Sequence, residues 1–121
     1  MQDVTVAMVA LGGYGNFYLE AMFDEGEAHD VRLVAGVDPN PVRCRYLDRL
    51  DAANIPIFPD LASFYRAMTA DLVVIAAPIP LHLPFTCTAL AHGSSVLCEK
   101  PVAATVQEAR AMAEAEAEAD G

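Results

Sequence analysis

Five short apolar runs alternate along this chain of 121 residues with five stretches rich in helix-forming residues. The apolar runs are residues 4–10, 31–37, 55–58, 72–76 and 95–98. The helical stretches are residues 14–25, 41–52, 61–68, 81–92 and 106–119. Because short loops join the two kinds of element in strict alternation, the sequence predicts an α/β fold with a doubly wound parallel sheet. Right-handed crossovers favour the strand order 3-2-1-4-5, with the first strand central.

Several residues mark where these elements begin and end. Asn40 precedes a proline, which predicts an N-cap and one continuous helix through residue 52. Pro56 lies within the third apolar run and predicts an edge strand, because proline cannot donate to a sheet ladder. Asp60 is expected to cap the third helix. Residues 105–108, Thr-Val-Gln-Glu, match a capping box that opens the last helix.

The first predicted helix is expected to turn apolar side chains toward the sheet. We expect Phe17 and Ala21 to face inward, with Leu19 and Met22 as further candidates. The fourth apolar run has no polar residue and therefore predicts a central strand, buried on both faces.

A glycine-rich loop follows the first predicted strand. Residues 10–15 match the pattern G-x-G-x-x-G, except that Ala10 replaces the first glycine. Gly12 would let the backbone approach a pyrophosphate, and Gly15 would let the helix pack close to the strand, as in Rossmann-like folds. Free N–H groups at the helix N-terminus favour an anion. Ala10 is tolerated if its backbone stays in the β conformation. The predicted cofactor-binding loop comprises Leu11, Gly12, Gly13, Tyr14 and Gly15.

Asp38 ends the second predicted strand, 23 residues after Gly15. Dinucleotide-binding folds carry an acid near this spacing. Its carboxylate would accept hydrogen bonds from the adenosine ribose and repel a 2′-phosphate, which favours NAD over NADP. Arg43 would soften that preference if it turned toward the ribose. The alternative interpretations are structural: a glycine turn, and a turn residue before Pro39.

The end of the fourth predicted strand supplies further candidates. Ala77 and Pro78 belong to a thin, proline-rich wall that suits a flat ring, although an ordinary loop between strand and helix would have the same composition. His82 lies in the first turn of the next helix, near the glycine loop in this topology. A lone histidine is more often structural than a ligand contact, so both roles remain open for it.

Glu99 and Lys100 follow the fifth predicted strand, where an apolar run stops abruptly. Ligands of open α/β sheets bind at this edge. Lys100 is the candidate catalytic residue, because its ammonium could bind a substrate hydroxyl or lose a proton if burial lowered its pKa. Glu99 would oppose that lowering. The alternative is a surface lysine in a loop.

The composition excludes several classes of function. The net charge is −10, from 17 acidic and 7 basic residues, which argues against a nucleic-acid partner. No apolar run approaches the ~18 residues of a membrane helix, and the N-terminus lacks signal-peptide features. The three cysteines include no CxxC pair, so neither a disulfide framework nor a zinc site is expected. We expect one cytoplasmic domain, residues 1–121, without a membrane or metal partner.

Four features together resemble the nucleotide-binding domain of the glucose–fructose oxidoreductase / inositol dehydrogenase / rhizopine-catabolism family. They are the 10–15 loop, Asp38, the stretch 78–82 (Pro-Ile-Pro-Leu-His) and Glu99-Lys100-Pro101. The resemblance implies an NAD(P)-dependent oxidoreductase that acts on sugars, polyols or their derivatives. It also implies that Lys100 lies near the nicotinamide and the substrate, where it aids proton transfer. Ala77 departs from the family, which often has Ser or Thr there.

The resemblance further implies a second α+β domain, which builds the substrate pocket and often the homo-oligomer interface. The chain stops at Gly121, and we expect that domain to be absent from it. We therefore expect weak NAD binding without turnover by this chain alone. A non-catalytic dinucleotide-binding sensor or interaction protein is the alternative. A methyltransferase-like domain that binds S-adenosylmethionine would also explain a glycine loop, but not Glu-Lys-Pro after the fifth strand.

Overall fold

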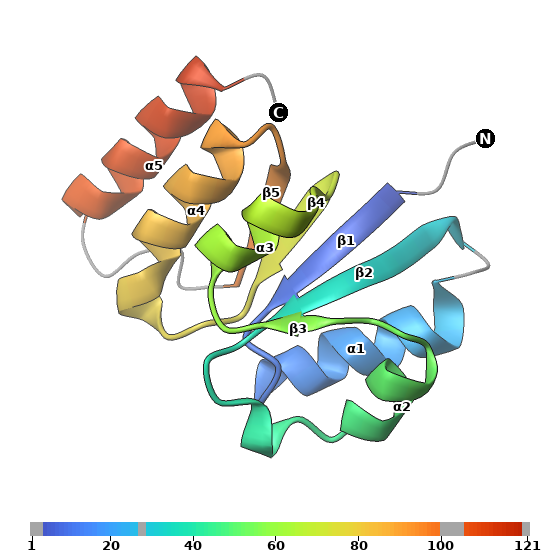
Figure 1. Cartoon of the computed structure of the whole chain (residues 1–121). Helices are drawn as coiled ribbons and strands as arrows, with labels where there is room; N and C mark the ends of the chain where they lie inside the picture. Colours follow the sequence, from blue (N-terminus) through green and yellow to red (C-terminus); the bar gives the residue numbers. More distant parts are fainter. Residues whose placement is uncertain (1–3, 27–28, 100–105, 120–121) are drawn as a thin grey trace.

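The computed structural model describes residues 4–26, 29–99 and 106–119 and joins five parallel strands in one sheet. The strands are β1 (Val4–Val9), β2 (Val31–Val37), β3 (Ile57–Phe58), β4 (Leu72–Ile75) and β5 (Ser95–Cys98). Their order is β3-β2-β1-β4-β5, and every neighbouring pair is parallel (Figure 1). The predicted order is therefore confirmed, with β1 in the middle and β3 at one edge.

Helices cover both faces of the sheet, as a doubly wound fold requires. The α-helices are α1 (Tyr14–Glu25), α2 (Leu47–Ala52), α3 (Leu61–Ala67), α4 (His82–Ala91) and α5 (Val106–Glu118). Two short 3-10 helices, η2 (Pro41–Arg43) and η3 (Ile79–Leu81), precede α2 and α4. In Figure 1, α1 and α2 lie on one face, and α3, α4 and α5 lie on the other. None of the described helices is long and apolar enough to cross a membrane.

The central strand β1 contributes to the core on both faces. Ala7 and Val9 pack in the cluster that contains α3 and α4 side chains. Val6 and Met8 point the other way and pack in the cluster that contains Leu19 of α1. This alternation follows from the two-residue period of a strand. Burial of each of the larger side chains, Val6, Met8 and Val9, contributes about 1.5–3 kcal/mol to stability.

The strand β2 carries one extra residue opposite β1. Val6 pairs with Leu33 and Ala7 pairs with Ala35, so Val34 is skipped in the register. Beyond this bulge, Ala35 lies in the same core cluster as Ala7. A bulge inserts a residue and re-aims the side chains that follow it. It therefore sets the direction in which the carboxyl end of β2 presents its side chains.

The predicted inward face of α1 is wrong in part. Phe17 is 63% exposed and Ala21 is also exposed, whereas Leu19 is fully buried and Met22 is half-buried. The reason is the close packing of Gly15, where an added Cβ would lie 2.1 Å from the carbonyl oxygen of Ala10. Because the helix approaches the sheet at Gly15, the residues four and seven positions later face the core.

The predicted continuous helix over residues 41–52 is also wrong, because it breaks at Cys44. Cys44 has an extended backbone, with φ −70° and ψ 126°, between η2 and α2. The side chain of Asn16 causes this break. Its Nδ2 donates to the Arg43 carbonyl oxygen (3.2 Å), and its Oδ1 accepts from the Arg45 N–H (2.8 Å). These bonds compete with helical pairing of residues 43 and 45, and Asn40 makes no side-chain cap.

Other boundary predictions are confirmed. Asp60 caps α3 by accepting a hydrogen bond from the Ser63 N–H (2.7 Å). The strand β3 is an edge strand, as Pro56 predicts, although it holds only two residues. The capping box at residues 105–108 begins outside the described residues, and α5 starts at Val106.

The amino ends of β1 and β4 are tied by Asp71. Its Oδ2 accepts from the Thr5 backbone N–H (3.0 Å) and hydroxyl (3.1 Å), and its own N–H donates to the Thr5 hydroxyl (2.9 Å). The backbone hydrogen bond and then the side-chain hydrogen bond from Thr5 lower the pKa of the Asp71 carboxyl. The native pKa is thus below the unfolded value.

The Asp71 carboxylate therefore stabilises the fold above the unfolded pKa, and this contribution is lost as pH falls through the native pKa. We expect Asp71→Asn to lower the thermal midpoint at neutral pH and to flatten its decline below about pH 4. Thermal unfolding followed by circular dichroism across this pH range is the measurement. The control is Asp51→Asn on the exposed surface of α2. Equal pH slopes for Asp71→Asn and the unmodified chain would contradict this role.

Candidate functional site

A cleft of about 840 Å³ opens at the carboxyl ends of β1, β2 and β4. Ligands of open α/β sheets bind at this edge. Seven of the residues predicted from the sequence line the cleft: Gly12, Gly13, Tyr14, Asp38, Arg43, Ala77 and Pro78. The fold therefore brings together the glycine loop, the end of β2 and the proline-rich wall after β4.

The remaining predicted residues do not line this cleft. Leu11 and Gly15 are buried, and His82 is only 2% exposed. Glu99 is directed toward α1, where its carboxylate accepts a hydrogen bond from a tyrosine described below. Lys100, the predicted catalytic residue, lies outside the described residues, as does Pro101.

The glycine loop turns sharply, and its first position is strained. The condition under which Ala10 would be tolerated, a backbone in the β conformation, is not met, because its φ is +72°. An L-residue in this left-handed region costs roughly 1–2 kcal/mol relative to the right-handed one. The turn is required because the Ala10 N–H remains bonded to Val37 (2.8 Å), while Gly15 packs against the Ala10 carbonyl. A glycine at the first position of the pattern would adopt this conformation without strain.

The loop offers backbone donors to the cleft. Gly13 precedes α1 with φ +54° and ψ −125°, a conformation that suits glycine. Within the described part of the chain, no hydrogen bond involves the N–H of Gly12 or Gly13. Both residues line the cleft beside the N-terminus of α1. Unpaired N–H groups at a helix N-terminus are the donors that bind phosphate.

The carboxylate of Asp38 joins the loop to the end of β2. Its Oδ2 accepts from the Leu11 N–H (3.0 Å), and its Oδ1 accepts from the Asn40 N–H (2.9 Å). The second bond is the turn contact that the structural interpretation of Asp38 anticipates. The side chain is half-buried and also lines the cleft. One carboxylate therefore fixes the loop and presents negative charge to the site.

His82 supports the wall of the cleft. Its Nε2 is 2.8 Å from the carbonyl oxygen of Ala77, and its ring is buried beneath the loop that follows β4. This contact holds Ala77 and the exposed Pro78 against the start of α4. Of the two roles considered for His82, a structural one and a contact with the ligand, this hydrogen bond supports the structural one.

The segment after β5 is tied to α1. The Glu99 N–H donates to the Ile75 carbonyl (2.9 Å), which continues the pairing of β5 with β4. The Tyr18 hydroxyl donates to Oε2 of Glu99. This hydrogen bond, followed by burial, raises the pKa of Tyr18 to about 12. Tyr18 was not predicted from the sequence, because no local pattern links it to a residue 81 positions away.

Several further residues of the cleft were not predicted as site residues. Pro59 and Asp60 come from the end of β3, and Leu81 and Phe85 come from the start of α4. Pro59 and Asp60 could have been found, because the carboxyl ends of parallel strands meet at one edge. The positions of Leu81 and Phe85 depend on how η3 turns into α4.

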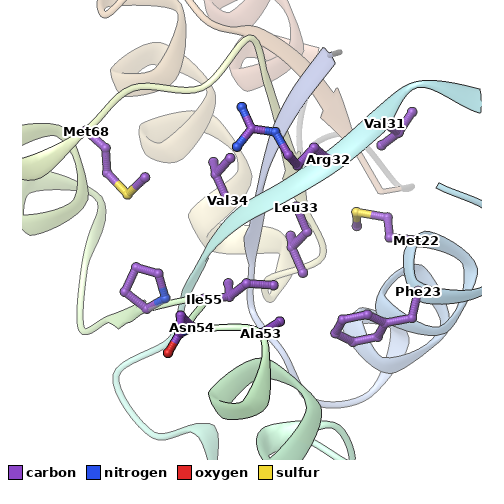
Figure 2. Close-up of a pocket in the computed structure, with 11 residues that line it drawn as sticks. Met22, Phe23, Val31, Arg32, Leu33, Val34, Ala53, Asn54, Ile55 and Met68 are labelled. Atoms are coloured by element: carbon purple, nitrogen blue, oxygen red, sulfur yellow. The ribbon is translucent and has the colours of Figure 1, made fainter. Parts of the chain in front are cut away.

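A second cavity, of about 580 Å³, lies at the opposite end of β2 (Figure 2). It is bounded by the amino half of β2, the turn before β3 and the ends of α1 and α3. Its lining is largely apolar, with Val34, Ile55 and Met68 among the labelled side chains. None of the predicted site residues lines it. No group of His, Cys, Asp or Glu within the described ranges could hold a metal ion.

Comparison with known proteins identifies the family. The family model described as "Oxidoreductase family, NAD-binding Rossmann fold" matches residues 4–121. The chain belongs to this family. It is the glucose–fructose oxidoreductase / inositol dehydrogenase / rhizopine-catabolism family that the sequence motifs resemble, and that resemblance is confirmed. The matched residues are its NAD-binding Rossmann domain.

The relatives of this chain include a polyol and a sugar dehydrogenase. An inositol 2-dehydrogenase of Rubrobacter xylanophilus is 33% identical over 117 residues, which are 97% of this chain and 33% of that protein. A D-xylose 1-dehydrogenase (NADP(+)) of Haloarcula marismortui is 44% identical over 111 residues, 92% of this chain and 31% of that protein. The chain thus spans about a third of the length of the curated relatives that it matches.

Solved structures of other proteins share the fold. The crystal structure of an oxidoreductase from Agrobacterium radiobacter in complex with NAD+, L-tartaric acid and magnesium aligns with a TM-score of 0.83 and 25% identity. The alignment covers 98% of this chain and 34% of that one. A dehydrogenase from Chromobacterium violaceum aligns with a TM-score of 0.83 and 27% identity, over 95% of this chain and 33% of that one.

The strain at Ala10 leads to a stability prediction. We expect Ala10→Gly to raise the free energy of unfolding by about 1 kcal/mol, because glycine relieves the left-handed strain and loses only part of that gain to chain entropy. Urea unfolding measures the change. Ala53→Gly is the matched control, since Ala53 has an ordinary φ of −89° and gains nothing from glycine. A lower stability for Ala10→Gly would show that the strain is absent.

The bond between Tyr18 and Glu99 leads to a titration prediction. Because the native pKa of Tyr18 is raised, the bond stabilises the fold below about pH 10 and is lost as pH rises through about 12. We expect Tyr18→Phe to remove the highest phase of a phenolate absorbance titration. Glu99→Gln should move that phase down toward about 10. Tyr14→Phe, the control, should leave it in place, and an unchanged phase in Tyr18→Phe would contradict the assignment.

Proposed function

We propose that this chain is the dinucleotide-binding part of an oxidoreductase that transfers a hydride between a nicotinamide cofactor and a sugar, a polyol or a derivative. The observation that carries the proposal is the cleft at the sheet edge, where unpaired loop N–H groups and the Asp38 carboxylate meet. The relatives support the substrate class, since they include an inositol and a xylose dehydrogenase.

The described residues fit a dinucleotide. The N–H groups of Gly12 and Gly13 would bind the pyrophosphate, and the N-terminus of α1 would favour its charge. Asp38 would accept hydrogen bonds from the adenosine ribose and so favour NAD over NADP. Ala77 and Pro78 would form a flat wall, held in place by His82. When bound, the nicotinamide supplies or accepts the hydride.

Tyr14 and Arg43 complete the proposed contacts. Tyr14 lies at the start of α1 and is 66% exposed, and Arg43 lines the same cleft. Leu11 and Gly15 would act through the shape of the loop that they belong to. Lys100 is the proposed catalytic residue for proton transfer. Glu99 would influence it as the neighbouring residue in the chain.

We propose that the substrate pocket and a homo-oligomer interface are built by a second domain, such as would fill the two thirds of the relatives' length that this chain does not span. We infer that this chain binds the cofactor but does not turn over substrate by itself. A reducing cytoplasm is the proposed compartment, and the free cysteines Cys44, Cys87 and Cys98 support it.

Isothermal titration with NAD and with NADP tests the proposal. We expect heat with NAD and weaker binding of NADP. Gly12→Val should abolish both, because a Cβ at Gly12 would lie 2.9 Å from the Arg43 Cβ and would block approach of the phosphates.

The control is Ala113→Val, an exposed change of similar size on α5. Circular dichroism of both variants shows whether the fold is kept. The absence of heat with either dinucleotide would exclude cofactor binding, and tighter binding of NADP would overturn the assigned role of Asp38.

A further inference from the structure

Asn16 makes an unusual pair of contacts for a helical side chain. It is the second residue after Tyr14 in α1 and is 6% exposed. Its amide donates to the Arg43 carbonyl (3.2 Å) and accepts from the Arg45 N–H (2.8 Å), one residue on either side of Cys44. A buried amide that bonds both sides of an extended residue holds that segment in one conformation.

The segment held in this way carries Arg43 to the cleft. Its Cβ sits against the glycine loop, at 2.9 Å from the position of a Cβ added to Gly12. Its side chain lines the cleft together with Asp38. Arg43 takes part in no ion pair among the described residues, whereas Arg49 lies 4.0 Å from Asp24. The guanidinium is therefore available to an anion in the cleft.

Two opposite charges thus flank the end of the cleft next to β2. Both oxygens of the Asp38 carboxylate already accept backbone hydrogen bonds, which fixes the negative charge in place. The position of the positive charge depends on the backbone at residues 43–45. A guanidinium binds a phosphate through charge-assisted and often bidentate hydrogen bonds, whose geometry depends on where the side chain begins.

We propose that Asn16 is a specificity-determining residue that acts through Arg43, by holding it where it can bind a phosphate on the adenosine ribose. Asn16 itself lies outside the cleft lining and is a positioning residue. The inference rests on the proposed function, because it concerns the preference between NAD and NADP at the same site. Loss of Asn16 would weaken binding of NADP more than binding of NAD.

A double-mutant cycle tests this inference, with the ratio Kd(NADP)/Kd(NAD) from isothermal titration as the readout. We expect Arg43→Ala to raise the ratio about tenfold, as the loss of one charge-assisted contact predicts. Asn16→Ala should raise it about fivefold while Arg43 is present. In the Arg43→Ala background, the same change should alter the ratio by less than about twofold.

Arg45→Ala is the matched control. It removes an equal charge two residues away and keeps the backbone N–H that bonds Asn16, so we expect the ratio to stay within about twofold of the unmodified value. Where Asn16→Ala fails to fold by circular dichroism, Asn16→Asp replaces it in the cycle. Aspartate keeps the acceptor for Arg45 and loses the donor to Arg43.

The outcomes separate this inference from the proposed function. An unmodified chain that binds neither dinucleotide would refute the proposed function. A chain that binds both, with an unchanged ratio after substitution of Asn16, would overturn the inference alone. A shift of the same size with and without Arg43 would also overturn it, because Asn16 would then not act through that residue. Uniform weakening of both ligands would indicate a purely structural role.

Discussion

The close approach of α1 to the end of β1 is the contact on which the rest of the structure depends. Gly15 permits it, since any larger residue would place a Cβ against the Ala10 carbonyl. The approach forces Ala10 into a left-handed conformation and turns Leu19 into the core. Gly12 and Gly13, whose N–H groups have no hydrogen-bond partner among the described residues, line the cleft beside this contact. One missing methyl group thus determines both a packing face and a binding site.

Side chains that bond to distant backbone groups complete the site. Asp38 fixes the glycine loop through the Leu11 N–H, and Asn16 fixes the segment around Cys44. His82 holds the wall through the Ala77 carbonyl. Backbone N–H and C=O groups in loops have few partners in regular secondary structure. Hydrogen bonds from these side chains satisfy backbone groups that would otherwise have to bond water. The cleft is therefore shaped by three polar side chains that belong to regular elements or their ends.

Much of the fold could be predicted from the sequence, because its signals are local. The continuous apolar run of β1, the proline near β3 and the cap at Asp60 each depend on residues close together in the chain. Strand order followed from crossover handedness, which is common to all such folds. The glycine loop and Asp38 were found for the same reason, since the spacing of the pattern is fixed.

The errors share a different cause, which is dependence on contacts between distant residues. The helix α1 carries apolar residues on more than one face, so the sequence did not show whether Phe17 or Leu19 points into the core. The packing at Gly15 decides it. The break at Cys44 depends on a side chain 28 positions earlier, and the bond of Tyr18 spans 81 positions. A helical turn does begin at Pro41, but hydrogen bonds from the Asn16 side chain take the backbone groups of residues 43 and 45 and end it.

The bulge at Val34 has a consequence for how the chain tolerates changes of length. Val34 is the residue of β2 that the register with β1 skips, so its neighbours Leu33 and Ala35 pair with consecutive residues of β1. Loss of Val34 would therefore restore regular pairing and leave every later side chain of β2 on its present face. Asp38 would stay at the glycine loop. A second deletion in this strand would have no bulge to absorb it, so it would exchange the two faces at the end of β2 and disconnect the site from an otherwise intact fold.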